Sequence, residues 1–172
     1  MSDFQVPFTI DLTGKTAVVT GAGGVLCSQF CKALAVCGAR VALIGRRIEP
    51  LQLLAEEIAA LGGTARGYSA DVLQKSQLEA ARSRIEADFG PCDILINGAG
   101  GNNAKATTTQ EYYEPDLLKG GELSFFDLEQ KDISSVFDLN LMGAILTTQV
   151  FARAMANRSG AVIINVSSMS AY

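Results

Sequence analysis

The 172 residues contain no histidine. This absence excludes the Ser-His-Asp hydrolases, the HExxH metalloproteases and every metal site that depends on an imidazole ligand. Any proton transfer would instead use a tyrosine, a lysine, a carboxylate or water.

Positive charge and long apolar runs are also scarce. Lys and Arg number 14 against 18 Asp and Glu, a net charge of −4, so we expect no nucleic-acid partner. No uninterrupted run of 18 apolar residues occurs, since Arg40 breaks the most hydrophobic stretch, and we therefore predict no membrane span. The first residues, MSDFQVPFTIDL, lack the basic and apolar regions of a signal peptide, which predicts a cytoplasmic protein.

The four cysteines lie at positions 27, 31, 37 and 92. Cys27 and Cys31 would share a helix face and could together clamp a soft metal. The favoured interpretation is that they are small buried hydrophobic residues in a reducing compartment, so no metal site is predicted.

Short apolar runs alternate with longer helical patterns along the chain, which is 48% hydrophobic. Strands are predicted at 16–20, 40–44, 65–69, 93–97 and 161–166, and helices at about 25–36, 49–61, 74–89 and 133–157. Such alternation is typical of a parallel sheet covered on both faces. We predict one domain over 1–172 with a doubly wound, Rossmann-like α/β fold of strand order 3-2-1-4-5. Ligands of such folds bind beyond the carboxyl ends of the strands.

A glycine-rich turn follows the first predicted strand. Gly21, Gly23 and Gly24 would let the backbone approach a pyrophosphate, with Val25 and Leu26 opening the next helix. Because Leu26 takes the third glycine position of GxGxxG, the motif alone is weak. A turn without a ligand remains the alternative.

The second predicted strand ends without the carboxylate that commonly holds the ribose hydroxyls of NAD. Gly45 stands there, and Arg46 or Arg47 could pair with a 2′-phosphate, which favours NADP. The alternative is two solvated arginines that are compatible with either cofactor.

The next two strands end in further candidate groups. Asp71 could accept a hydrogen bond from an adenine amino group, or it could cap the following turn. A second small-residue turn, 97–101, would face the first glycine-rich turn across the sheet.

Several motifs in order resemble the classical short-chain dehydrogenase/reductase family. They are Thr20-Gly21, Ala70-Asp71-Val72, the DILIN run at 93–97, the DLNL run at 138–141 and the INVSS run at 164–168. The segments GGVLC, NGAGGNNAKATT and FFDL…VFDLNLMG look more narrowly like its D-mannonate (fructuronate) oxidoreductase subgroup. The resemblance implies an NAD(P)-dependent enzyme that is a homo-oligomer when complete.

The resemblance also implies roles for individual residues. Ser168 would hydrogen-bond the substrate carbonyl, and Asn140 would bend its helix around a water of a proton relay. Asp71 and Val72 would contact adenine. The ribose would be lined by Asn97, Ala99 and Gly100.

The sequence departs from the family pattern in three ways. In TGxxxGxG, Val25 and Cys27 replace the second and third glycines, and the usual NNAG reads NGAG at 97–100. The Tyr-x-x-x-Lys acid/base pair, expected near position 181, would lie beyond Tyr172. We therefore expect a truncated domain, inactive alone, whose last strand is an uncovered apolar edge.

An insertion of about 101–126 lengthens the connection after the fourth strand. It carries Asn102, Asn103, Lys105 and the pair Tyr112-Tyr113. A lid over an anionic, polyhydroxylated substrate and an unstructured surface insertion are both open.

The leading hypothesis is an oxidoreductase that moves a hydride between NAD(P) and a sugar-acid alcohol or ketone such as D-mannonate or D-fructuronate. The alternative is a non-catalytic nucleotide-binding module. The missing Tyr-Lys pair favours the module, whereas retention of Ser168 and Asn140 favours the enzyme.

Overall fold

The computed structural model describes residues 10–112 and 121–168, so Tyr113 and Tyr172 lie outside the described residues. Its centre is a five-stranded parallel sheet of order β3-β2-β1-β4-β5, which confirms the predicted strand order. The strands are β1 (Thr16–Thr20), β2 (Arg40–Gly45), β3 (Thr64–Ser69), β4 (Ile94–Asn97) and β5 (Val162–Asn165).

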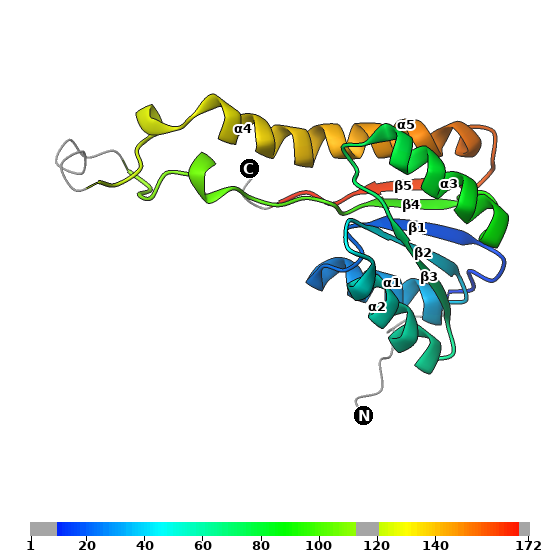
Figure 1. Ribbon diagram of the computed structural model, residues 1–172. Coiled ribbons are helices and arrows are strands. Elements are labelled where there is room, and N and C mark those ends of the chain that lie inside the picture. Colours follow the sequence, from blue (N-terminus) through cyan, green and yellow to red (C-terminus); the bar gives the residue numbers. More distant parts are fainter. Residues whose placement is uncertain (1–9, 113–120, 169–172) are drawn as a thin grey trace.

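Helices cover both faces of this sheet (Figure 1). One face packs on α1 (Val25–Val36) and α2 (Ile48–Ala60), and the other on α3 (Lys75–Phe89) and α5 (Gly143–Met155). The strand residues alternate between the two cores, since Val18 faces α3 and α5 whereas Ala17 and Val19 face α1 and α2. This alternation makes all five residues of β1 buried and produces the continuous apolar run seen in the sequence.

The helix predicted at 133–157 begins earlier and contains a break in its hydrogen-bond pattern. It consists of α4 (Gln130–Phe137), a π-helical turn η4 (Asp138–Met142) and α5. Val150, Phe151 and Met155 of α5 enter the core, whereas Phe137, Leu141 and Ile145 project outward. π turns occur often at functional sites, and this one contains Asn140.

By length and composition alone, the continuous helix Gln130–Met155 is apolar enough to cross a membrane. Its most apolar window is 22% buried. A core helix of a soluble protein can meet the same criterion, and the inner half of this one packs against α3. The absence of a membrane span therefore stays a prediction.

Strand β5 forms an exposed edge of the described sheet. Its side chains remain 39–46% exposed at Val162, Ile163 and Ile164, although its backbone pairs with β4 in register. The expectation of an uncovered apolar edge strand is thus met in the residues that the structure describes.

Asp93 joins the amino ends of three strands, at the end of the sheet opposite the expected site. Its carboxylate accepts hydrogen bonds from the Thr16 amide at 3.0 Å and from Arg158 at 2.6 Å, and Lys15 lies 3.9 Å away. Burial by itself raises the pKa of Asp93, but the bond from Arg158, the Thr16 amide and the two cationic charges outweigh it. The net effect lowers the pKa below its usual value.

Replacing Asp93 with Asn is expected to lower the free energy of unfolding by about 2 kcal/mol at pH 7, because a charge-assisted network loses its buried anion. A lowered folded-state pKa means that the stabilisation is present above the unfolded value of about 3.9 and is lost as the pH falls through the folded value. The difference from wild type should therefore shrink below about pH 4. Urea unfolding at several pH values measures this, with Glu79→Gln on the exposed side of α3 as control. A gap that stays constant with pH would contradict the assignment.

Candidate functional site

The two glycine-rich turns meet at the carboxyl edge of the sheet, on the hydroxyl of Thr20. Its Oγ1 accepts from the amides of Gly98 at 3.1 Å and Ala99 at 3.2 Å, and it donates to the Ile96 carbonyl at 3.4 Å. Thr20 is 1% exposed, so no water replaces these bonds. The last residue of β1 thereby fixes the position of the turn after β4.

Gly21 is required where the turns approach each other. Its φ is +67°, and a Cβ there would lie 2.6 Å from the Gly98 carbonyl oxygen. The Gly24 amide closes the turn onto the Gly21 carbonyl at 2.9 Å. The first-turn amides of α1, at the positive end of the helix, are therefore presented at the sheet edge, an arrangement suited to an anion.

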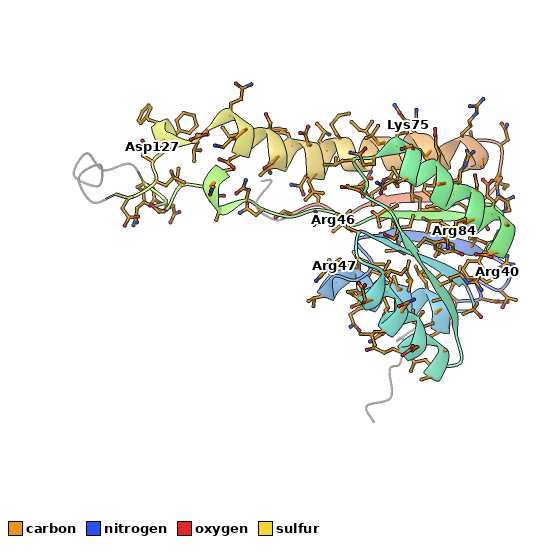
Figure 2. The ribbon with its side chains drawn as sticks, in the orientation of Figure 1. Arg40, Arg46, Arg47, Lys75, Arg84 and Asp127 are labelled. Carbon is orange, nitrogen blue, oxygen red and sulfur yellow. The ribbon has the colours of Figure 1, made fainter. Side chains whose placement is uncertain are left out.

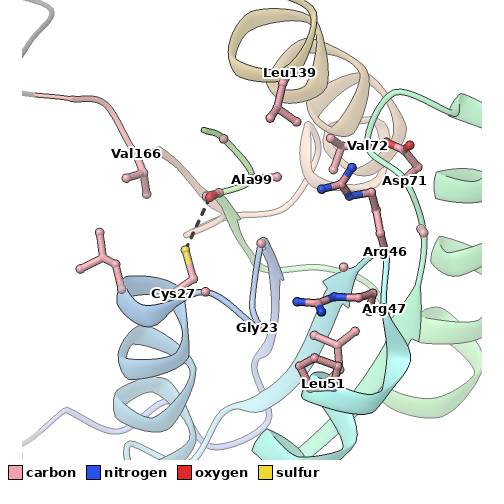
Figure 3. Close-up of a pocket in the computed structure, with 18 of the residues that line it drawn as sticks. Gly23, Cys27, Arg46, Arg47, Leu51, Asp71, Val72, Ala99, Leu139 and Val166 are labelled. Atoms are coloured by element: carbon pink, nitrogen blue, oxygen red, sulfur yellow. Dashed lines mark hydrogen bonds between the residues drawn. The ribbon is translucent and has the colours of Figure 1, made fainter. Parts of the chain in front are cut away.

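A pocket of about 420 Å³ lies over these turns (Figure 3). This volume is in the range of small-molecule sites. Ten predicted cofactor residues line it: Gly21, Gly23, Gly24, Val25, Leu26, Arg46, Asp71, Val72, Ala99 and Gly100.

Asn97, which was predicted as a ribose contact, has its side-chain amide nitrogen hydrogen-bonded within the protein. It is 5% exposed and is absent from the described lining of the pocket. Its amide nitrogen donates to Thr148 Oγ1 at 2.9 Å and to Asn165 Oδ1 at 2.8 Å. At the end of β4 the side chain therefore ties the sheet to α5 and β5 beneath the pocket.

The pocket also includes residues that the sequence did not single out as cofactor contacts. Pro50 and Leu51 enter from the first turns of α2, and Leu139 and Val166 form another part of the wall. Position gives a signal for Val166, which directly follows a strand end. Leu139 lines the pocket from the π turn, which periodicity does not reveal.

Arg46 and Arg47 give one side of the pocket positive charge. Both lie at the carboxyl end of β2, whereas Arg40 lies at its start (Figure 2). Figure 3 shows both guanidinium groups directed into the pocket, across from Val166. In the described part of the chain neither has an ion-pair partner among the salt bridges.

Asp71 stabilises a turn and also lines the pocket. Its Oδ1 accepts from the Leu73 amide at 3.0 Å, and its own amide donates to Gln77 at 2.9 Å, so it stabilises the turn after β3. The same residue lines the pocket. The structural role therefore fixes the carboxylate at the position where it can meet a ligand.

Asn140 and Ser168 adjoin the pocket without lining it. Asn140 follows Leu139, and Ser168 lies two residues after Val166. The Asn140 amide nitrogen donates to the Gly101 carbonyl at 2.8 Å and to the Val136 carbonyl at 3.0 Å, and its Oδ1 accepts from the Gly101 amide at 3.0 Å. The side chain thus clamps Gly101, the first residue of the insertion.

The described parts of the insertion form an arm with its own contacts, which extends past the sheet beside α4 (Figure 1). Asn103 donates to Asp132 and Ser135 of α4, at 3.2 and 3.0 Å. Farther out, the Thr109 amide donates to the Leu123 carbonyl at 3.0 Å and joins the outgoing and returning segments. These contacts favour a built extension over an unstructured insertion.

Cys27 and Cys31 are buried between α1 and the sheet and are free thiols. Burial raises the pKa of both. No cluster of three or more potential metal ligands occurs within residues 10–112 and 121–168.

The fold and the pocket define a Rossmann-like nucleotide-binding architecture, and comparison with known proteins identifies the family. The family model for short chain dehydrogenase matches residues 15–172. The chain belongs to the short-chain dehydrogenase family.

Individual relatives show the same similarity. The Bacillus subtilis uncharacterized oxidoreductase UxuB is 46% identical over 168 residues, which are 98% of this chain and 59% of that protein. A crystal structure from Haemophilus influenzae, provisionally assigned as a D-mannonate oxidoreductase with bound NAD, is 48% identical with a TM-score of 0.91 over 94% of this chain and 57% of that one. A metagenomic short-chain oxidoreductase in complex with NADP is 29% identical with a TM-score of 0.77 over 94% of this chain and 65% of that one. The chain therefore spans less than three fifths of the length of the curated relatives it matches at this level.

Replacing Thr20 with Val is expected to lower the free energy of unfolding by about 2 kcal/mol, since two partly buried amides lose their acceptor. Thr20→Ser keeps the hydroxyl and should lose only about 1 kcal/mol for the methyl group. Urea unfolding of both variants makes the comparison. Equal losses would assign the effect to packing.

Replacing Asn140 with Ala is expected to speed hydrogen exchange of the Gly101 amide by about fivefold, the equivalent of one net hydrogen bond. The Lys105 amide donates to Asn103 Oδ1 at 3.0 Å, so Asn103→Ala should speed hydrogen exchange at Lys105 and leave the Gly101 amide protected. NMR-detected exchange resolves the two amides. Unchanged exchange at Gly101 in Asn140→Ala would show that another contact holds the arm.

Proposed function

We propose that the chain forms the cofactor-binding part of a cytoplasmic oxidoreductase that moves a hydride between NAD(P) and the alcohol or ketone of a sugar acid, D-mannonate or D-fructuronate. The observation that carries the proposal is the pocket between the two glycine-rich turns, at the point where the winding of the sheet reverses between β1 and β4. When bound, the nicotinamide accepts or donates the hydride.

The residues present fit a dinucleotide. Side chains are excluded where Gly21 meets Gly98, which keeps the backbone accessible beside the amino end of α1 for a pyrophosphate. Asp71 and Val72, which line the pocket, would contact the adenine, and Ala99 and Gly100 would contact a ribose.

The reactive end of the pocket would lie at Leu139 and Val166. They bring Asn140 and Ser168 to its border, where the Ser168 hydroxyl would donate to a substrate carbonyl. Asn140 would hold the π turn and the arm in place around a relay water. Retention of both residues supports an enzyme over a binding module.

The arginines favour NADP within the general class of nicotinamide cofactors. Arg46 and Arg47 point into the pocket from a strand end where Gly45 replaces the customary carboxylate, so a 2′-phosphate meets cations without repulsion. Among the related structures, three contain NAD or NADH, including the one at 48% identity, and one contains NADP.

The sugar-acid substrate is supported by the 48% identity to the protein provisionally assigned as a D-mannonate oxidoreductase. A homo-oligomer is supported by the apolar face of the long helix, where Phe137 is 61% and Leu141 52% exposed.

The cofactor proposal is tested by titrating the chain with NADPH and NADH and following the fluorescence of the nicotinamide. We expect NADPH to bind at least about tenfold more tightly, and Arg46→Ala to remove most of this preference, because a charge-assisted bond of about 1.5–3 kcal/mol is lost. Arg84→Ala is the control, since Arg84 lies over the ring of Tyr68, outside the pocket lining. Equal affinities in the wild-type chain would contradict the NADP preference. Binding of neither nucleotide would contradict the function.

The substrate is tested by thermal unfolding with NADPH present. D-fructuronate should raise the midpoint by about a further 2 °C, as expected for a ligand above its dissociation constant, and Ser168→Ala should lose this increment while keeping the cofactor shift. Uncharged D-fructose is the matched ligand control. An equal increment with D-fructose would exclude recognition of the acid group.

A further inference from the structure

Cys27 and Gly98 touch across the two glycine-rich turns. The Cys27 thiol lies in the first turn of α1, and its Sγ donates to the Gly98 carbonyl at 3.7 Å (Figure 3). Both residues line the pocket, and Cys27 is 4% exposed. The thiol therefore fills the junction between the turns.

Gly98 lacks a side chain because of what surrounds it. It is not among the glycines with positive φ, so its backbone conformation accepts other residues. A Cβ at this position would overlap Cys27 Sγ and would approach the Thr20 carbonyl oxygen at 3.0 Å. The first of these contacts requires the Cys27 thiol to move away, whereas the second requires a shift of a few tenths of an ångström. Cys27 is thus the main obstacle to a side chain at 98.

The two positions are also where the sequence leaves the family pattern. Cys27 adds a side chain where the pattern TGxxxGxG has its last glycine, and Gly98 removes one where the pattern NNAG has its second asparagine. From the sequence these are unrelated changes about 70 residues apart along the chain. In the structure they occupy one space.

We propose that Cys27 and Gly98 are a matched pair that sets the distance between the two glycine-rich turns and so positions the dinucleotide. The consequence for the cofactor rests on the proposed function, whereas the steric match does not. Cys27 acts as a positioning residue, because it contacts the turn after β4 and this turn lines the dinucleotide pocket. A side chain at 98 is compatible only with a smaller residue at 27.

A double-mutant cycle with Cys27→Gly and Gly98→Ala tests the pairing. Gly98→Ala alone should lower the urea midpoint by about 1 M and weaken NADPH binding at least about tenfold, because the added methyl meets the thiol. With Cys27→Gly in the same chain, the same substitution should cost less than about threefold in affinity. Cys27→Gly alone should fold and bind NADPH several-fold more weakly, since the turns lose their spacer.

Cys31→Ala is the matched control. Cys31 lies one turn along α1, is 0% exposed and does not line the pocket. It should lower the urea midpoint, leave NADPH affinity within about twofold and fail to rescue Gly98→Ala.

The outcomes separate the two proposals. If Gly98→Ala is as harmful in the Cys27→Gly chain as in the chain that keeps Cys27, the Thr20 carbonyl excludes the side chain and the pairing is overturned. If the affinity of folded Cys27→Gly equals that of wild type, the thiol has no positioning role. If the wild-type chain binds no NADPH, the proposed function is contradicted. The urea midpoints of the double-mutant cycle still test the steric match between Cys27 and Gly98.

Discussion

The pocket depends on one buried hydroxyl. Thr20 ends the central strand, and its Oγ1 holds the turn that follows β4 by two amide hydrogen bonds. Because β1 and β4 are neighbours at the reversal of the winding, this contact brings the two glycine-rich turns together at the carboxyl ends of the strands. The close approach at Gly21, the packing of Cys27 on Gly98 and the exposure of the first amides of α1 all require that the turns stay at this separation.

The opposite edge of the sheet is organised by charge. The buried Asp93 carboxylate, with the partly exposed Arg158 and Lys15, gathers the starts of β1 and β4 and the approach to β5 in an ionic network. One edge is thus fixed by an ion pair and the other by a neutral hydroxyl. The edge that is free of this buried anion is the one that presents Arg46, Arg47 and the positive end of α1 to an anionic ligand.

The strand order and ten of the residues that line the pocket could be predicted because parallel strands leave continuous apolar runs, and each run ends at the edge where ligands of such folds bind. Asn97 was placed in the pocket by resemblance, but its side chain is used for hydrogen bonds to Thr148 and Asn165, which no local pattern reveals. The dependence of Gly98 on Cys27 is likewise a contact between distant segments. The order of the arm depends on Asn140 and Asn103, whose partners are fixed only when the arm lies beside α4.

The π turn at Asp138–Met142 has a geometric consequence for the arm. Each extra residue in a helix turns everything beyond it by about 100° around the axis. The wider turn therefore sets the rotational phase of α4 against α5, so that the inner face of α5 can enter the core while α4 carries Asp132 and Ser135 to the arm. The π turn thus fixes the rotation of α4 relative to α5 about the common helix axis. It lies at the pocket wall, which Leu139 of this turn lines.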